Sequence, residues 1–170
     1  MDTLISPTPD AAVEFFRLDA ETQSGFGFEA ACADYSEDRC TDLLRGAGLR
    51  PTRQRLMLGQ LMFAKGDRHV TADMLYTEAL AAGIHVSQAT VYNTLNQFTQ
   101  AGLLRRIGPD GSRSFFDTNT SVHPHFFVDG EDVLFDVPEP GVLLEHVPEP
   151  LPGHEISRVD VIVHLRRKQS

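Results

Sequence analysis

The chain has 170 residues, of which 41% are hydrophobic and 23% charged, a balance that is typical of a soluble globular protein. Neither a membrane span nor a secretory leader is expected. The apolar runs are only as long as strands, and the opening MDTLISPTPD carries an acid and no basic residue. Two cysteines, Cys32 and Cys40, are too few for a disulfide framework and favour a reducing cytoplasm.

The net charge of −9 is unevenly distributed along the chain. Residues 1–40 contain 9 acidic and 2 basic side chains, residues 41–118 contain 6 and 9, and residues 119–170 contain 9 and 4. A basic middle leaves room for a nucleic-acid partner, because DNA binding needs local rather than global positive charge. The alternative is that the charge distribution is ordinary surface variation. A motif in residues 41–118 is needed to decide between the two interpretations.

The first elements in chain order are an acidic arm and a short helix. Residues 1–40 are expected to form the arm, in which DAAVEFFRLDAET has the pattern of an amphipathic helix. The segment ACADYSEDRCTDLLRGAG follows, with Leu43 and Leu44 as apolar positions. Gly46 and Gly48 then predict the end of a helix.

Three further helices are predicted before residue 102. Pro51 suits the first turn of one helix, Thr71 suits the N-cap of the next, and Ser87 suits the N-cap of the last. The last run reads VSQATVYNTLNQFTQAG, where Val91 and Leu95 recur at helical spacing. Each run ends at a glycine, which predicts separate helices joined by short turns.

A hairpin and several strands follow the helices. In LLRRIGPDGSRSFFD, two β-type runs flank a GPDG turn. Helices followed by such a hairpin are the order of a winged helix-turn-helix. Beyond residue 118, HPHFFVDG, EDVLFDV and ISRVDVIVHLRR are predicted strands, and a short LLEHV lies between prolines. The sequence therefore predicts an α+β protein with an arm (1–40), a winged helix (41–118) and a second small domain (119–170).

The helix that begins after Ser87 is predicted to enter the major groove of DNA. Hydrogen-bonding side chains crowd its first two turns, where Asn and Gln can recognise adenine edges, namely Gln88, Thr90, Tyr92 and Asn93. Basic residues in the same domain suit phosphate contacts, namely Arg50, Arg53, Arg105 and Arg113. A plain helical bundle with a solvated polar face is the alternative, because its periodicity is the same.

The stretch SVHPHFFVDG carries two histidines that could share a metal. His123 and His125 lie two apart, so on a strand both would point to one face. Asp117 ends the predicted hairpin and His69 precedes the third helix; imidazole with carboxylate suits Fe²⁺, Mn²⁺ or Zn²⁺. The alternative is that these are surface histidines or satisfied core histidines. Pro124 donates no hydrogen bond, so the strand is either an edge strand or begins at His125.

Three segments resemble the ferric uptake regulator family over about residues 41–165: GLRPTRQRLMLGQLMF, HVTADMLYTEAL and ATVYNTLNQFTQAGLLRRIGPDGSRSFFD. The resemblance implies a homodimeric, metal-responsive transcription factor on double-stranded DNA, with a winged helix and a C-terminal α/β dimerisation domain. It implies that His69, Asp117, His123 and His125 match ligands of the family's regulatory site in order and spacing. Asp136 matches a further acidic ligand of the peroxide-sensing members.

The chain also departs from the family in ways that resemble the iron response regulator branch. Asn93 stands where many members have arginine, and HFF follows the histidines. That branch is implied to act in iron limitation and to use haem, for which His123 and His125 are candidate ligands. Pro124 replaces the middle of the three consecutive histidines of that haem site. The two CxxC pairs of the family's structural zinc site are absent from the sequence, so apolar strands are expected to hold the dimer, with Val159, Val161 and Val163 on one face.

Other functions remain open from the sequence. Asp117 in place of the usual glutamate, together with Asp136, favours a peroxide-sensing repressor as the alternative. A metal-dependent hydrolase would use the same three histidines and an acid, but the sequence offers no general base or nucleophile, so we expect a protein that is not an enzyme. A haem-buffering protein would bind haem without DNA. Cys32 and Cys40 are expected to be buried thiols.

Overall fold

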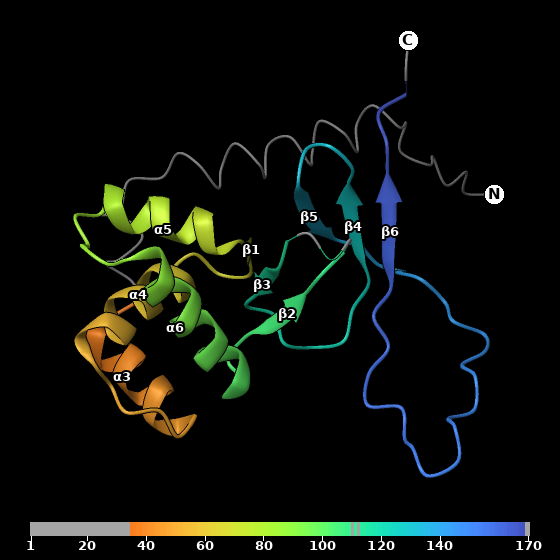
Figure 1. Cartoon of the computed structure of the whole chain (residues 1–170), viewed down its shortest axis with the longest axis horizontal. Coiled ribbons are helices and arrows are strands. Elements are labelled where there is room, and N and C mark those ends of the chain that lie inside the picture. Colours follow the sequence, from red (N-terminus) through yellow and green to blue (C-terminus); the bar gives the residue numbers. More distant parts are fainter. Residues whose placement is uncertain (1–34, 110, 112, 169–170) are drawn as a thin grey trace, which may run out of the picture.

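The computed structural model describes residues 35–109, 111 and 113–168 (Figure 1). The helices are α3 (Glu37–Gly46), α4 (Arg53–Phe63), α5 (Ala72–Ala81) and α6 (Gln88–Gln100). The strands are β1 (His69–Val70), β2 (Arg105–Ile107), β3 (Phe115–Asp117), β4 (His125–Val128), β5 (Val133–Asp136) and β6 (Ile162–Leu165). The α+β prediction is confirmed; the amphipathic helix predicted within the arm and Cys32 lie outside the described residues.

Each described helix begins after a Ser or Thr that caps it. The hydroxyls of Ser36, Thr52, Thr71 and Ser87 accept a hydrogen bond from the backbone N–H three residues on. The caps predicted at Thr71 and Ser87 are confirmed. The prediction for Pro51 was wrong, because Thr52 caps α4 and Pro51 lies before the cap instead of in the first turn.

The helices enclose one apolar core, to which β3 contributes Phe116. All four described helices also contribute large, fully buried members, namely Leu44, Leu58, Met62, Leu75, Leu95 and Phe98. Cys40 is buried in the same core, and burial raises the pKa of its thiol to about 11. Cys40 is therefore a buried thiol, as predicted. No described helix combines the length and the apolar character that crossing a bilayer requires.

The first sheet has the strand order β1-β3-β2, and all of its pairs are antiparallel. The predicted hairpin is confirmed as β2 and β3, with Ile107 opposite Phe115. Asp117 has His69 opposite it on one side and Arg105 opposite it on the other. Three polar side chains from distant parts of the sequence therefore form one row across the sheet. β1 was not predicted, because two residues are too few to show an alternating pattern.

The second sheet has the order β5-β4-β6, with β4 antiparallel to β5 and parallel to β6. Of the two alternatives for Pro124, the strand begins at His125, and β4 is central instead of an edge strand. His125 lies opposite Asp136 on β5 and beside Ile162 on β6. Only the last part of ISRVDVIVHLRR is a strand, so Val159 and Val161 precede β6.

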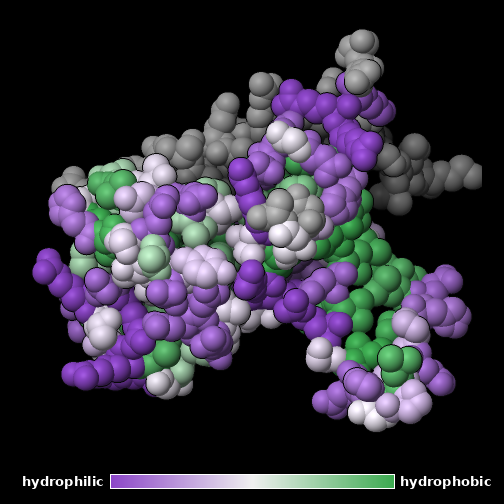
Figure 2. All heavy atoms as spheres, in the orientation of Figure 1, coloured by the Kyte–Doolittle hydropathy of each residue, from purple (hydrophilic) through white to green (hydrophobic). Residues whose placement is uncertain are grey.

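The connection between β5 and β6 runs over residues 137–161 without a helix or strand. Parallel strands need such a long crossover, which is usually a helix. The prolines around LLEHV oppose helix formation, and the segment forms neither a helix nor a strand. Exposed apolar side chains gather along it and β6 (Figure 2), namely Val142, Leu143, Leu144, Val147, Leu151, Ile156, Val159 and Leu165.

A buried ion pair holds the residue before His69 against α5. Both Arg68 Nη atoms donate to the Glu78 carboxylate, at 3.0 and 2.5 Å, and Nη1 also donates to Leu61 O at 3.3 Å. The Arg68 side chain is only 2% exposed. Burial would raise the pKa of Glu78, but Arg68 and Lys65 outweigh it and lower that pKa.

Glu78→Gln is expected to lower the free energy of unfolding by about 3 kcal/mol, because it leaves the buried Arg68 charge without a carboxylate. Urea denaturation at pH 7 measures the change. The control is Glu131→Gln, which removes the partner of the exposed Arg167 and should change the free energy of unfolding far less, because water screens that pair. Equal effects of the two substitutions would contradict the role of the Arg68–Glu78 pair.

Candidate metal centre

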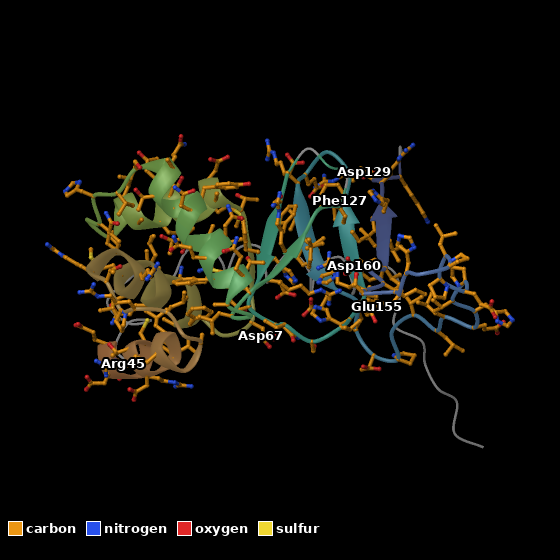
Figure 3. The ribbon with its side chains drawn as sticks, turned by 60° about the horizontal axis from the view of Figure 1, so that its bottom comes forward. Arg45, Asp67, Phe127, Asp129, Glu155 and Asp160 are labelled. Atoms are coloured by element: carbon orange, nitrogen blue, oxygen red, sulfur yellow. The ribbon has the colours of Figure 1, made fainter. Side chains whose placement is uncertain are left out.

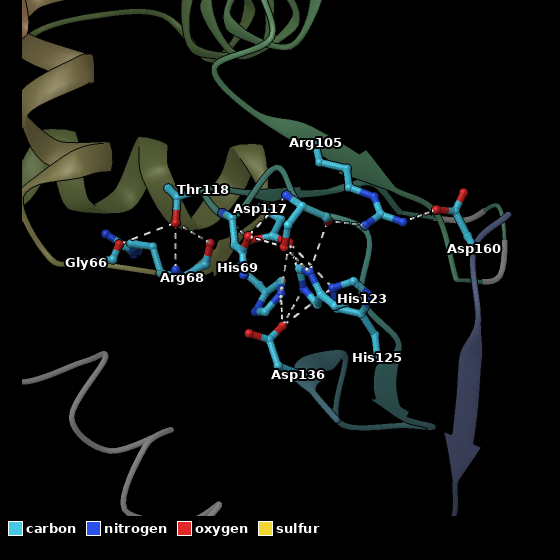
Figure 4. A network of polar contacts seen from close by, with 12 residues as sticks. Gly66, Arg68, His69, Arg105, Asp117, Thr118, His123, His125, Asp136 and Asp160 are labelled. Atoms are coloured by element: carbon cyan, nitrogen blue, oxygen red, sulfur yellow. Dashed lines mark hydrogen bonds and ion pairs between the residues drawn. The ribbon is translucent and has the colours of Figure 1, made fainter. Parts of the chain in front are cut away.

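Five side chains converge where the two sheets approach each other (Figure 4). They are His69 on β1, Asp117 at the end of β3, His123 in the following loop, His125 on β4 and Asp136 at the end of β5. One candidate ligand atom from each lies within 4.8 Å of all the others. The structure thus brings together all five residues that the sequence analysis proposed as metal ligands.

Strand pairing explains this convergence. His69 and Asp117 are direct neighbours across the first sheet, and His125 and Asp136 are direct neighbours across the second. Cross-strand neighbours carry their side chains on the same face, about 5 Å apart. The loop 118–124 joins β3 to β4, brings these two pairs together and supplies His123 between them.

Each imidazole faces both carboxylates through its Nε2 atom. The Asp117 Oδ2 atom lies 3.5 Å from His69 Nε2, 3.2 Å from His123 Nε2 and 3.5 Å from His125 Nε2. The corresponding distances from Asp136 Oδ1 are 3.1, 2.9 and 3.6 Å. The five atoms therefore surround one point, which is the arrangement that a single ion requires.

Several of these atoms are buried without a hydrogen-bond partner among the described residues. They are His69 Nε2, His125 Nε2 and Asp117 Oδ2. The other oxygen of Asp117 accepts a hydrogen bond from the Asn119 N–H at 2.8 Å, which turns Oδ2 toward the histidines. A buried polar atom left unpaired costs about 1–3 kcal/mol, so three of them around one point fit a cation that would bind them all.

Charges shift the pKa values of the cluster. Burial would lower the pKa of His69, but Asp117 and Asp136 outweigh it and raise that pKa to about 9. Burial would raise the pKa of Asp117, but His125 and His69 outweigh it and hold the carboxyl well below its usual range. Both carboxylates are therefore ionised at neutral pH and supply two negative charges. With three imidazoles they suit Fe²⁺, Mn²⁺ or Zn²⁺.

The predicted DNA-contacting residues lie apart from this cluster. Gln88, Tyr92 and Asn93 are exposed on the first turns of α6, and Thr90 is half-buried, with its hydroxyl 2.9 Å from that of Ser87. Arg50, Arg53 and Arg113 are also exposed, and Arg113 Nη1 lies 2.8 Å from Asp132. These residues remain available at the surface, as a DNA contact requires.

Arg105 is a correction to the sequence analysis. Its side chain is only 6% exposed, donates to Ser121 O at 2.6 Å and forms an ion pair with Asp160. A guanidinium that is buried and neutralised in this way is not available to a DNA phosphate. The pairing could not be predicted, because Asp160 lies 55 positions from Arg105 in the chain.

Two supporting residues escaped the sequence analysis. The Asn119 N–H donates to Asp117, and the Asn119 side chain accepts from Ser121 N–H at 3.1 Å. The Ser121 carbonyl oxygen lies 3.1 Å from His123 Nδ1. The stretch TNTSVHP is rich in residues whose side chains hydrogen-bond to nearby backbone, and that composition was the available signal.

With this geometry established, comparison with known proteins identifies the class. The profile of the ferric uptake regulator family matches residues 46–137, more than half of the chain. The chain therefore belongs to the ferric uptake regulator family.

The ferric uptake regulation proteins of Shigella flexneri and Pseudomonas aeruginosa are 38% identical to this chain over 82 residues and 39% identical over 80, respectively. Those matches cover 48% and 47% of this chain and 55% and 60% of the two relatives, so the chain spans about half the length of the curated relatives it matches.

Solved structures agree on the fold. The ferric uptake regulator from Pseudomonas aeruginosa with manganese has a TM-score of 0.58 at 25% identity and matches 76% of this chain and 98% of its own. The ferric uptake regulator of Vibrio cholerae has a TM-score of 0.59 at 20% identity and matches 75% and 98%. The shared architecture thus extends beyond the helices to the second sheet.

Replacing a buried member of the cluster should remove metal binding. His125→Ala is expected to lower Mn²⁺ affinity by more than the roughly 10–100-fold that changes around a metal ligand cost, because it deletes a ligand outright. Calorimetric titration measures the affinity. His164→Ala is the control, since His164 is exposed and bonded to Asp129. Unchanged Mn²⁺ affinity in His125→Ala would contradict the ligand assignment.

Proposed function

We propose that this protein is a metal-responsive, sequence-specific DNA-binding regulator of transcription that acts in iron and haem homeostasis. The observation that carries the proposal is the cluster of five candidate ligands, which draws on strands of both sheets. Family membership supports the regulatory role, and the cluster supports the response to a divalent metal. Membership of a family of regulators favours regulation over catalysis.

Metal binding would link the two parts of the molecule. We take residues 41–118 as the DNA-binding domain and 119–170 as the dimerisation domain, with 1–40 as an arm. His69 and Asp117 then belong to the first domain, and His123, His125 and Asp136 to the second. An ion that binds both sets favours the arrangement in which they meet, and its differential affinity sets the size of the shift.

The DNA surface is the exposed start of α6. In this proposal Gln88, Tyr92 and Asn93 face base edges in the major groove, with Thr90 beside them. Arg50, Arg53 and Arg113 contact phosphates, which position the helix without reading sequence. The basic balance of residues 41–118 supports this assignment, although the whole chain is acidic.

A second copy of the chain is the proposed partner at the C-terminal sheet. β6 is an edge strand, and exposed apolar side chains extend from it along residues 137–161 (Figure 2). Contiguous exposed apolar surface of this kind marks protein interfaces. Since the family's usual cysteine pairs are absent from the sequence, this surface is what would hold a homodimer in the cytoplasm.

Haem binding through His123 or His125 stays a prediction, and the burial of these two histidines limits how haem could reach them. His125 is 1% exposed and its Nε2 faces the two carboxylates, so a haem could reach it only if the cluster opened. His123 is more accessible, at 15% exposure. Haem binding would therefore compete with the divalent metal instead of adding to it.

DNA binding should require the metal. Labelled DNA from upstream of the protein's own gene and of haem-synthesis genes is titrated by fluorescence anisotropy at fixed salt, because phosphate contacts make affinity salt-dependent. We expect tight binding by Mn²⁺-loaded protein and weak binding by metal-free protein, with haemin reversing the effect of Mn²⁺. His125→Ala should bind weakly under both conditions. Equal affinity with and without Mn²⁺ would overturn the proposal.

Peroxide sensing is the second candidate, favoured by the presence of Asp136 in the cluster and of aspartate at position 117. If it is correct, iron-loaded protein treated with hydrogen peroxide should gain one oxygen atom on His69, His123 or His125. Peptide mass spectrometry would locate it. The manganese-loaded protein is the matched control, and an unmodified iron-loaded protein would exclude this candidate.

A further inference from the structure

Arg105 lies at the centre of a contact chain that the metal site does not by itself explain. It starts on β2, opposite Asp117, and its Nη1 donates to the Ser121 carbonyl at 2.6 Å. Its Nη2 forms the ion pair with Asp160, and its Nε is buried without a hydrogen-bond partner in the described part of the chain. Asp160 therefore provides the compensating charge for an otherwise isolated buried cation.

The Ser121 carbonyl transmits this anchoring to His123. The same oxygen lies 3.1 Å from His123 Nδ1. A carbonyl oxygen can only accept, so Nδ1 is the protonated nitrogen in this contact. Nε2 of the same ring then points at Asp117 and Asp136, at 3.2 and 2.9 Å. The orientation and tautomer of this candidate ligand thus depend on where the Ser121 carbonyl is held.

Asp160 connects these contacts of Arg105 to the second sheet. It lies just before β6, on the side of the C-terminal sheet (Figure 3), and also pairs with Arg158 Nε at 2.6 Å. Burial would raise the pKa of Asp160, but Arg105 and Arg158 outweigh it and lower that pKa. Three segments therefore meet at Arg105, namely strand β2, the loop 118–124 and the residues just before β6 (Figure 4).

We propose that Arg105 and Asp160 form a latch that positions His123 for metal binding and joins β2 to the residues just before β6. Arg105 is a positioning residue in this latch, because it touches no candidate ligand atom and acts through the Ser121 carbonyl. The inference rests on the metal site of the proposed function. Residues that orient metal ligands in this way contribute to affinity without contacting the ion.

Mn²⁺ titration of the full chain tests the latch. Asp160→Asn and Arg105→Lys are each expected to weaken Mn²⁺ binding about tenfold. Lys cannot hold both partners, since it lacks the planar fork of arginine. The matched control is Asp132→Asn, which breaks the exposed pair between Arg113 of the β2–β3 hairpin and Asp132 of the β4–β5 turn. It should change the Mn²⁺ affinity less than about twofold.

A double-mutant cycle separates positioning from general stability. If Arg105 acts through His123, adding Arg105→Lys to His123→Ala should lower Mn²⁺ affinity less than about twofold further, because the two effects share one path. A full tenfold loss in that background would overturn the proposal, since Arg105 would then act independently of His123. Using Asp160→Asn in the same cycle covers the case in which Arg105→Lys fails to fold.

A measurement on metal-free protein keeps the latch testable if the proposed function fails. Amide hydrogen exchange in peptides covering 118–124 should accelerate in Asp160→Asn and stay unchanged in Asp132→Asn. If wild-type protein binds no Mn²⁺, the proposed metal response is wrong, and this exchange still decides whether the latch holds the loop. Unchanged exchange in Asp160→Asn would overturn the latch.

Discussion

Asp117 carries a carboxylate that is fully buried at the end of β3, and a buried charge is costly unless opposite charge or hydrogen bonds compensate it. One oxygen accepts from the Asn119 N–H, and the other faces three imidazoles. Those imidazoles come from β1, the loop 118–124 and β4. The need to compensate this one carboxylate is thus the physical constraint that brings both sheets to a common point.

The same row of the first sheet serves two purposes. His69 and Arg105 flank Asp117 on opposite sides, and one lies in the cluster while the other anchors the loop that supplies His123. Strand β2 is therefore connected to the candidate metal site through the backbone of the loop 118–124. A change in the position of His123 could therefore be passed through the Ser121 carbonyl to Arg105 on β2. The exposed polar residues of α6 are not part of this set of contacts.

The second sheet adds a different property. Its parallel strand β6 is reached through a proline-containing segment without helix or strand, where a helix would usually stand, and apolar side chains are left on the surface as a result. Asp160, at the end of that segment, is held by Arg105. The segment that carries the proposed dimer surface is thereby joined to β2 by one ion pair, in which the Arg105 side chain is buried.

The sequence by itself determined where the described helices begin and end, and its resemblance to a known family supplied the candidate ligand set. Ser and Thr caps and terminal glycines are local signals. The match to the family's ligand positions was needed to propose one site from His69, Asp117, His123, His125 and Asp136. Only the tertiary structure decided that β1 exists, that β4 is central and that Arg105 is internal. Each of these depends on pairing between segments far apart in the chain, and no local pattern of residues specifies such a pairing. A surface arginine and a buried one look alike in sequence; the position of Asp160 in the fold makes the difference.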